Sequence, residues 1–111
     1  MENAEIKLSG SEKQIAWATD IINGARECIA RGIEHHTLGG AINVSTGEHR
    51  KQPDDDLWIE GYEKLSESFE KLVAKTTEAK DIIDNRDRYT DHSLIGYVNK
   101  YVLKVQNLRN R

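Results

Sequence analysis

Apolar side chains recur every three or four residues in the first third of the chain, which is the spacing of one face of an α-helix. Ser11 precedes this pattern and Gln14 stands three residues later, so the two form a capping box at the start of a helix. Arg31 and Gly32 form a stop signal, because a cation suits the last turn and a glycine commonly follows it. The pattern therefore predicts a first helix over about 11–32. Its predicted buried face consists of Ile15, Ala18, Ile22, Ala25 and Ile29, widened by Trp17, Ile21 and Cys28.

A second helix is predicted to begin after Pro53, where three consecutive aspartates stand. Carboxylates in a first turn satisfy free backbone amides and suit the helix dipole. Apolar residues then recur with helical spacing as far as residue 73. The predicted inner face consists of Leu57, Gly61, Leu65, Phe69 (or Ser68) and Leu72, with Trp58, Tyr62 and Val73 beside it.

Two further patterns complete the helical prediction. Thr77 is placed to cap a short third helix that ends near Asn85, with Ala79, Ile82 and Ile83 on its packed side. Thr90 or Asp91 is placed to cap a last helix, whose apolar positions follow a heptad spacing. These positions are Leu94, Val98, Tyr101, Val105 and Leu108, supported by Ile95 and Val102.

Residues 33–53 interrupt the helical pattern. Gly39-Gly40 and Thr46-Gly47 are typical of turns, and residues 41–44 have room for a short extended piece. A connection of about twenty residues without structure of its own is unusual in a compact domain and is commonly functional. We therefore expect a binding loop here.

The composition agrees with an all-α fold. Charged residues make up 32% of the 111 residues and aromatics only 6%, a mixture that favours solvated amphipathic helices over a β-sandwich or barrel. We predict a single domain over residues 1–111, built as a small four-helix bundle with one long loop, 33–53, that has room for a β-ribbon. The apolar runs are short and there is one cysteine, so we expect a cytoplasmic protein without a membrane span or a disulfide.

Charge is distributed unevenly along the chain. Residues 54–93 carry twelve acids against six bases, whereas residues 94–111 carry four bases and no acid. The two segments can pair across the bundle, or the acids can form a functional surface. A first helical turn needs only one or two acids, so the surplus either solvates the surface or meets a basic partner. If it meets a partner, we expect His35 and His36 in the loop to take part in the contact. The candidate partner-binding acids are Asp54, Asp55, Asp56, Glu60, Glu63, Glu67 and Glu70.

The only cluster that resembles metal ligands consists of Glu34, His35, His36 and His49. Adjacent histidines point in different directions and no His-x3-His spacing is present, so we expect loop histidines that titrate near neutral pH and no metal site. Cys28 lies within the first helix and far from its N-terminus, which favours a small buried side chain over a nucleophile. No phosphate loop or acid–base pair stands out, so we expect no cofactor and no catalytic residue.

The last helix carries a basic face. Bases with interleaved aromatics can bind nucleic acid, and Tyr97 and Tyr101 lie among these bases. Four charges are few for a nucleic-acid footprint, so a solvated face is the favoured interpretation and nucleic-acid contact the alternative. The bases are Lys100, Lys104, Arg109 and Arg111.

The segment Leu8-Ser-Gly-Ser-Glu-Lys-Gln-Ile-Ala-Trp-Ala18 resembles a pattern near the start of small uncharacterised proteins from bacterial phages, plasmids and integrative elements. Some of those proteins also carry a downstream segment similar to residues 79–86, usually with an aromatic where this chain has Ile82. The shorter core, Ser11-Glu-Lys-Gln14, is similar to segments of phage recombination and helicase-associated proteins. The resemblance covers under a fifth of the chain and implies an origin in a mobile element.

These observations favour a non-enzymatic protein that binds a macromolecule, with a protein as the expected partner. Within that class, the acids and the mobile-element resemblance are typical of an inhibitor of a host defence nuclease, such as an anti-CRISPR protein, because carboxylates can lie where DNA phosphates would. The first alternative is an accessory protein of recombination or replication that contacts nucleic acid. An enzyme or a metal protein is the second alternative. The oligomeric state stays open.

Overall fold

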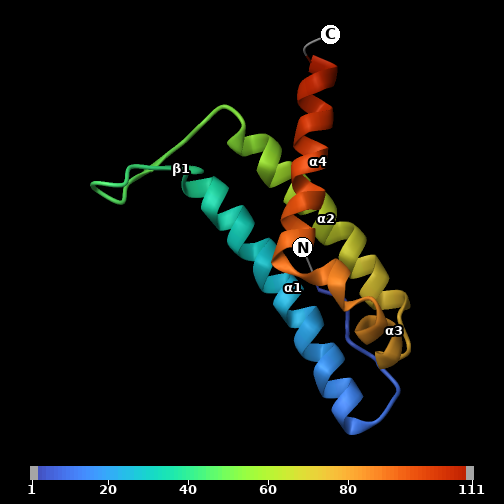
Figure 1. The fold of residues 1–111 in the computed structure, drawn as a ribbon. Coiled ribbons are helices and arrows are strands. Elements are labelled where there is room, and N and C mark those ends of the chain that lie inside the picture. Colours follow the sequence, from blue (N-terminus) through green and yellow to red (C-terminus); the bar gives the residue numbers. More distant parts are fainter. Residues whose placement is uncertain (1–2, 110–111) are drawn as a thin grey trace.

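The computed structural model describes residues 3–109. α1 and α2 run antiparallel and side by side, and α4 turns back along α2 after a short α3 (Figure 1). A two-stranded antiparallel ribbon lies between α1 and α2 in the chain. The predicted all-α fold of four helices with a short ribbon is therefore confirmed. The elements are α1 (Glu12–Leu38), β1 (Ala41–Ile42), β2 (His49–Arg50), α2 (Asp55–Lys75), α3 (Ala79–Asp84), the 3₁₀ turn η1 (Arg86–Tyr89) and α4 (Asp91–Arg109).

The capping box at the start of α1 is present as predicted. The Ser11 hydroxyl accepts a hydrogen bond from the amide of Gln14 at 3.2 Å, and the Gln14 side-chain oxygen accepts one from the amide of Ser11 at 3.1 Å. These two bonds satisfy backbone donors that a helix start otherwise leaves free. Local sequence therefore determines where α1 begins.

The predicted end of α1 is wrong, because the helix continues through Gly32 to Leu38. A Cβ atom on residue 32 would lie 2.3 Å from Cζ of Tyr62, so glycine here lets the ring of α2 pack directly on the backbone of α1. The helix ends instead at Gly39, which has φ of 122° and donates its amide to the carbonyl of His35 at 3.0 Å. That φ favours glycine over any residue with a Cβ.

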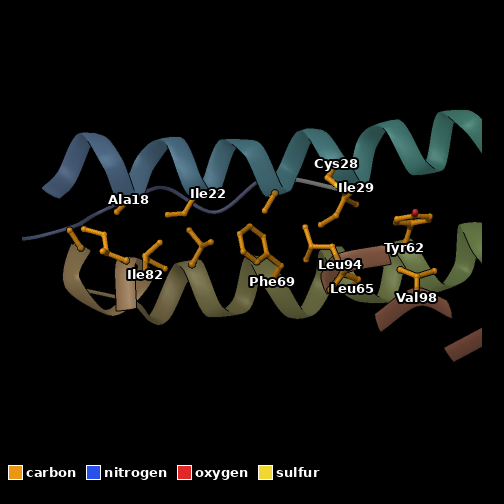
Figure 2. Close-up of a cluster of buried hydrophobic side chains, with 14 of the residues drawn as sticks. Ala18, Ile22, Cys28, Ile29, Tyr62, Leu65, Phe69, Ile82, Leu94 and Val98 are labelled. Carbon is orange, nitrogen blue, oxygen red and sulfur yellow. The ribbon is translucent and has the colours of Figure 1, made fainter. Parts of the chain in front are cut away.

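The core lies mainly between α1 and α2, with α3 and α4 closing its two ends (Figure 2). Ala18, Ile22 and Ala25 of α1 are fully buried, which confirms the predicted inner face of that helix. On α2, the prediction placed Leu72 inside, but Val73 is buried there and Leu72 is 40% exposed. The remaining buried apolar residues are Cys28, Ile29, Leu57, Tyr62, Leu65, Phe69, Ala79, Ile82, Ile83, Leu94, Val98 and Val102.

The last two helices differ from prediction in their details. Glu78, not Thr77, is the N-cap of α3, and its side chain makes no capping bond. Thr90 caps α4, since its hydroxyl accepts the amide of Ser93 at 3.2 Å. The predicted heptad face of α4 is buried only in part, because Leu108 is 58% exposed. The C-terminal part of α4 extends beyond the other helices (Figure 1).

Residues 3–10 form an extended strap that the helical prediction did not include. Its side chains alternate, with Ala4, Ile6 and Leu8 packed against the core and their neighbours exposed. At its end, the Ser9 amide donates to the carbonyl of Thr77 at 2.7 Å, and the Ser9 carbonyl accepts the amide of residue 79 at 2.9 Å. The strap thus joins the start of the chain to the turn between α2 and α3.

Candidate functional site

The seven acids predicted to contact a partner divide into two groups. Asp55 and Glu70 have only 2% and 8% of their surface exposed, so the expectation that they are exposed acids is wrong. Both carboxylates are engaged in hydrogen bonds within the chain. The acids that remain exposed are Asp54, Asp56, Glu60, Glu63 and Glu67.

Asp55 anchors the base of the ribbon. Its Oδ1 accepts hydrogen bonds from Nδ1 of His36 at 2.7 Å and from the amide of Gly40 at 3.0 Å, and its Oδ2 accepts the amide of Gln52 at 2.6 Å. Burial by itself would raise the pKa of this carboxyl, but the bonds from His36 and the two amides outweigh burial and hold the pKa below its ordinary value. One carboxylate therefore ties the end of α1, both sides of the ribbon and the start of α2 together.

His35 and His36 lie in the last turns of α1 and not in a loop, because the helix runs on to Leu38. The His36 ring stacks on Trp58, with centroids 5.1 Å apart and planes 8° apart. Its ring nitrogen is used by Asp55, so His36 supports the fold instead of facing a partner. The prediction that these residues belong to an exposed loop surface is wrong for His36, whose side chain is only 14% exposed.

The histidines do lie close together. The ring of His35 is 5.0 Å from that of His36 and 5.7 Å from that of His49, measured between centroids. His49 Nδ1 is within hydrogen-bond distance of the Gly39 carbonyl, at 2.8 Å. Within residues 3–109, no three or more side chains of His, Cys, Asp or Glu are arranged to hold a metal ion. The cluster acts in the structure as packing around the ribbon base.

Glu70 forms a second buried anchor. Its carboxylate accepts two bonds from Arg26, with Nη2 at 2.7 Å and Nε at 3.0 Å, and a third from the amide of Ala4 at 2.8 Å. Arg26 also donates to the carbonyl of Ala4 at 2.7 Å. Burial by itself would raise the pKa of Glu70, but these bonds from Arg26 and Ala4 lower it below its ordinary value. The pair fastens the strap across α1 and α2.

The exposed acids of α2 lie on one side of that helix. Asp56, Glu60, Glu63 and Glu67 are separated by four, three and four residues, so they share one helical face, which we call the acid face. Asp56 is the only one of the four in an ion pair among the described residues, with Lys51 at 3.5 Å. Glu60 lies beside Tyr101 of α4, because burial and then the neighbouring Glu60 carboxylate raise the pKa of that tyrosine. Glu63 and Glu67 are exposed and form no ion pair among the described residues, so they are the part of the acid face available to a partner.

The ribbon projects away from the helices (Figure 1). It carries two exposed apolar side chains. Val44 is fully exposed and Ile42 is 51% exposed; we call these two residues the ribbon tip. The turn that joins β1 to β2 is closed by a hydrogen bond from the amide of Asn43 to the carbonyl of Glu48, at 2.9 Å. Gly47, with φ of 73°, lies within this turn. The sequence indicated a binding loop here but did not single out these two residues.

The basic residues of α4 are exposed at Lys100, Lys104 and Arg109, as predicted for a solvated face. Arg111 lies outside the described residues. Tyr97 is 50% exposed, whereas Tyr101 is half-buried beside α2, where a Cβ on Gly61 would approach its ring to 3.0 Å. The two tyrosines therefore do not form one aromatic platform.

Cys28 is 6% exposed and lies in the core, as predicted. Burial raises the pKa of its thiol to about 11, and the nearby Asp91 carboxylate adds to the rise. A thiol with so high a pKa is protonated at neutral pH, so it is a poor nucleophile.

No protein-family model, curated protein or solved structure matches this chain. Within the described residues, no helix is both long enough and apolar enough to cross a membrane.

Proposed function

We propose that this chain is a non-enzymatic domain that binds a protein partner through the ribbon tip and the adjacent acid face. The ribbon tip carries the proposal, because Val44 and Ile42 expose apolar surface on a segment whose base is held by the buried carboxylate of Asp55. A preorganised apolar projection loses little conformational entropy when it is buried in a partner.

The acid face indicates which charge we expect on the partner's surface. Lys51 pairs with Asp56 where the ribbon meets α2, so the acid face begins at the ribbon base. Exposed carboxylates steer the encounter with a basic surface and contribute less to the final affinity than buried contacts do. The partner we expect therefore has a basic surface next to an apolar pocket.

A narrower version of the proposal is an inhibitor of a host defence nuclease that originates in a phage or another mobile element. It is supported by the acid face, which can meet cations that otherwise contact DNA phosphates, and by the resemblance of residues 8–18 and 79–86 to mobile-element proteins. Nucleases of this kind have basic channels, which fits the partner expected above.

The test is an interference assay in bacteria, in which the chain is expressed beside individual CRISPR nucleases and survival of a targeted plasmid is scored. We expect protection with at least one nuclease, and binding of that purified nuclease at low salt. Val44→Asp should abolish binding, and Glu63→Lys combined with Glu67→Lys should weaken it at least tenfold and flatten its dependence on salt. Lys13→Glu, on the exposed side of α1, is the control that should leave binding unchanged.

If the chain protects the plasmid from none of the nucleases tested, the narrower version is contradicted. Binding that survives Val44→Asp would contradict the broader proposal. Retention on double-stranded DNA at low salt, released as salt rises and lost in Lys100→Glu, would favour the accessory role on nucleic acid instead.

A further inference from the structure

A groove of about 860 Å³ lies between α2, η1 and α4. Its volume is within the range of pockets that hold drug-sized ligands or several apolar side chains. The apolar lining comes from all three elements and consists of Leu65, Phe69, Leu72, Tyr89, Leu94 and Tyr97. This groove is separate from both the ribbon tip and the acid face.

The groove has a buried floor and exposed walls. Leu65, Phe69 and Leu94 belong to the core and are less than 8% exposed, whereas Leu72 and Tyr97 on opposite helices are 40% and 50% exposed. The helical pattern of α2 predicts Leu72 as an inward-facing residue, yet no element of the described chain covers it. Exposed large apolar side chains grouped in one concave surface are typical of binding sites.

Small residues keep the groove open between its walls. A Cβ added to Gly96 would meet no atom within 4 Å, so α4 presents bare backbone there. Ser68 of α2 and Ser93 of α4 also line the groove. A shape that is wide and unobstructed suits a helix better than an enclosed small molecule, which needs most of its surface buried.

The rim of the groove is basic. Arg88 and Lys100 line it and are exposed, and within residues 3–109 no carboxylate lies within ion-pair distance of either side chain. His92 adds a further nitrogen donor, and Asp87 is the single acid among the lining residues. Two cations that form no ion pair with the described part of the chain, beside apolar walls, are complementary to a ligand that combines apolar and acidic groups.

We propose that this groove receives an amphipathic helix of a partner protein, with apolar side chains between Leu72 and Tyr97 and acidic side chains paired with Arg88 and Lys100. Helices that bind in grooves use apolar anchors at positions i, i+3 or i+4, and i+7, and their flanking charges determine orientation. The proposal does not depend on the proposed function, because the two surfaces share no residue.

The experiment is a display selection on the full-length immobilised chain. The library is a 14-residue helical peptide with leucine fixed at positions i, i+4 and i+7 and with its other positions random. We expect enrichment of Asp and Glu beside the leucines, and binding of the enriched synthetic peptides to the wild-type chain. Leu72→Glu and, separately, Arg88→Glu with Lys100→Glu should each weaken that binding at least tenfold.

A matched control variant distinguishes a loss of binding at the groove from a general effect of added charge. Leu103→Glu introduces the same charge at an apolar side chain of α4 that is 49% exposed and does not line the groove, and it should leave peptide affinity unchanged. Circular dichroism on each variant verifies that the helices are intact. A loss of affinity confined to the groove variants supports the proposal.

Three results would overturn it. The selection could enrich no peptide, it could enrich peptides without acidic residues, or the enriched peptides could bind Leu72→Glu as tightly as the wild-type chain. Sedimentation distinguishes a partner helix from a second copy of this chain. If the wild-type chain self-associates and Leu72→Glu abolishes the association, a second copy fills the groove in place of a partner helix.

Discussion

The ring of Tyr62 lies against the backbone of Gly32, so close that a Cβ on residue 32 would come within 2.6 Å of three ring carbons. Tyr62 is 4% exposed and is enclosed by the core, so its ring cannot move aside freely. The contact between α1 and α2 at this point therefore depends on a residue without a side chain. This contact explains why a glycine stands in the interior of α1 despite its low helix propensity.

Gly32→Ala should destabilise the fold. Alanine favours a helix over glycine by about 1 kcal/mol, but overpacking against a fixed ring costs about 1–3 kcal/mol, so we expect a net loss. Gly24→Ala is the matched control in the same helix, since a Cβ there meets no atom within 4 Å, and it should raise the melting temperature. Thermal melts followed by circular dichroism measure both changes. Stabilisation by Gly32→Ala would show that the two helices lie farther apart.

The sequence predicted those features of the fold that depend on interactions between residues close together in the chain. The capping box of Ser11 and Gln14 and the apolar face through Ile22 depend on residues within a few turns of one another, and both were predictable. The end of α1 was not, because Gly32 is indistinguishable from a stop signal unless the position of Tyr62 is known. The alternation of Ala4, Ile6 and Leu8 was a readable signal for the strap, since a period of two indicates an extended segment.

The candidate site was predictable only in part for the same reason. Asp55 and Glu70 share helix α2 with the acid face, and nothing next to them in sequence separates them from it. Their partners lie 19 residues away at His36 and 44 residues away at Arg26. Burial that depends on contacts so distant in sequence cannot be deduced from the pattern of one helix.

Glu70→Ala should be strongly destabilising. It would leave the Arg26 guanidinium, whose side chain is 17% exposed, without its carboxylate, and breaking a buried pair by removing one partner costs about 3 kcal/mol. Glu67→Ala, an exposed acid on the same helix, should change stability by less than about 0.5 kcal/mol. Urea unfolding of the two variants gives the comparison. Equal stability would mean that the pair with Arg26 contributes nothing.

Acid should weaken the fold through Asp55 and Glu70. Both have a lower pKa in the folded chain, so the unfolded chain binds more protons and stability falls as pH falls. Their contribution should be complete above the ordinary carboxyl range of about pH 4 and should disappear as pH falls through the lowered pKa values. Melting temperatures between pH 7 and pH 2 should show this decline. Asp55→Asn should melt lower at pH 7 and lose less on acidification; an unchanged acid slope would contradict the assignment.

Cys28 should resist alkylation in the folded chain. With a pKa of about 11, its thiol is ionised to only about one part in a thousand at pH 8, and it is 6% exposed. Iodoacetamide at pH 8 should therefore label the native chain at least a hundredfold more slowly than the chain in guanidinium, as followed by mass spectrometry. Rapid labelling without denaturant would mean that α1 and α4 separate readily around this residue.

The strap has a consequence for the order in which the chain folds. Ala4 bonds to Glu70 across 66 residues, and Ser9 bonds to Thr77 and to the residue two beyond it, so the strap can dock only when its distant site exists. Closing so long a loop is entropically costly before other contacts hold the ends together. The antiparallel pair of α1 and α2 needs a shorter closure, through the ribbon, and should form first. The strap would then dock after the transition state for folding. A mutation that weakens its contacts should therefore leave the folding rate nearly unchanged and increase the unfolding rate.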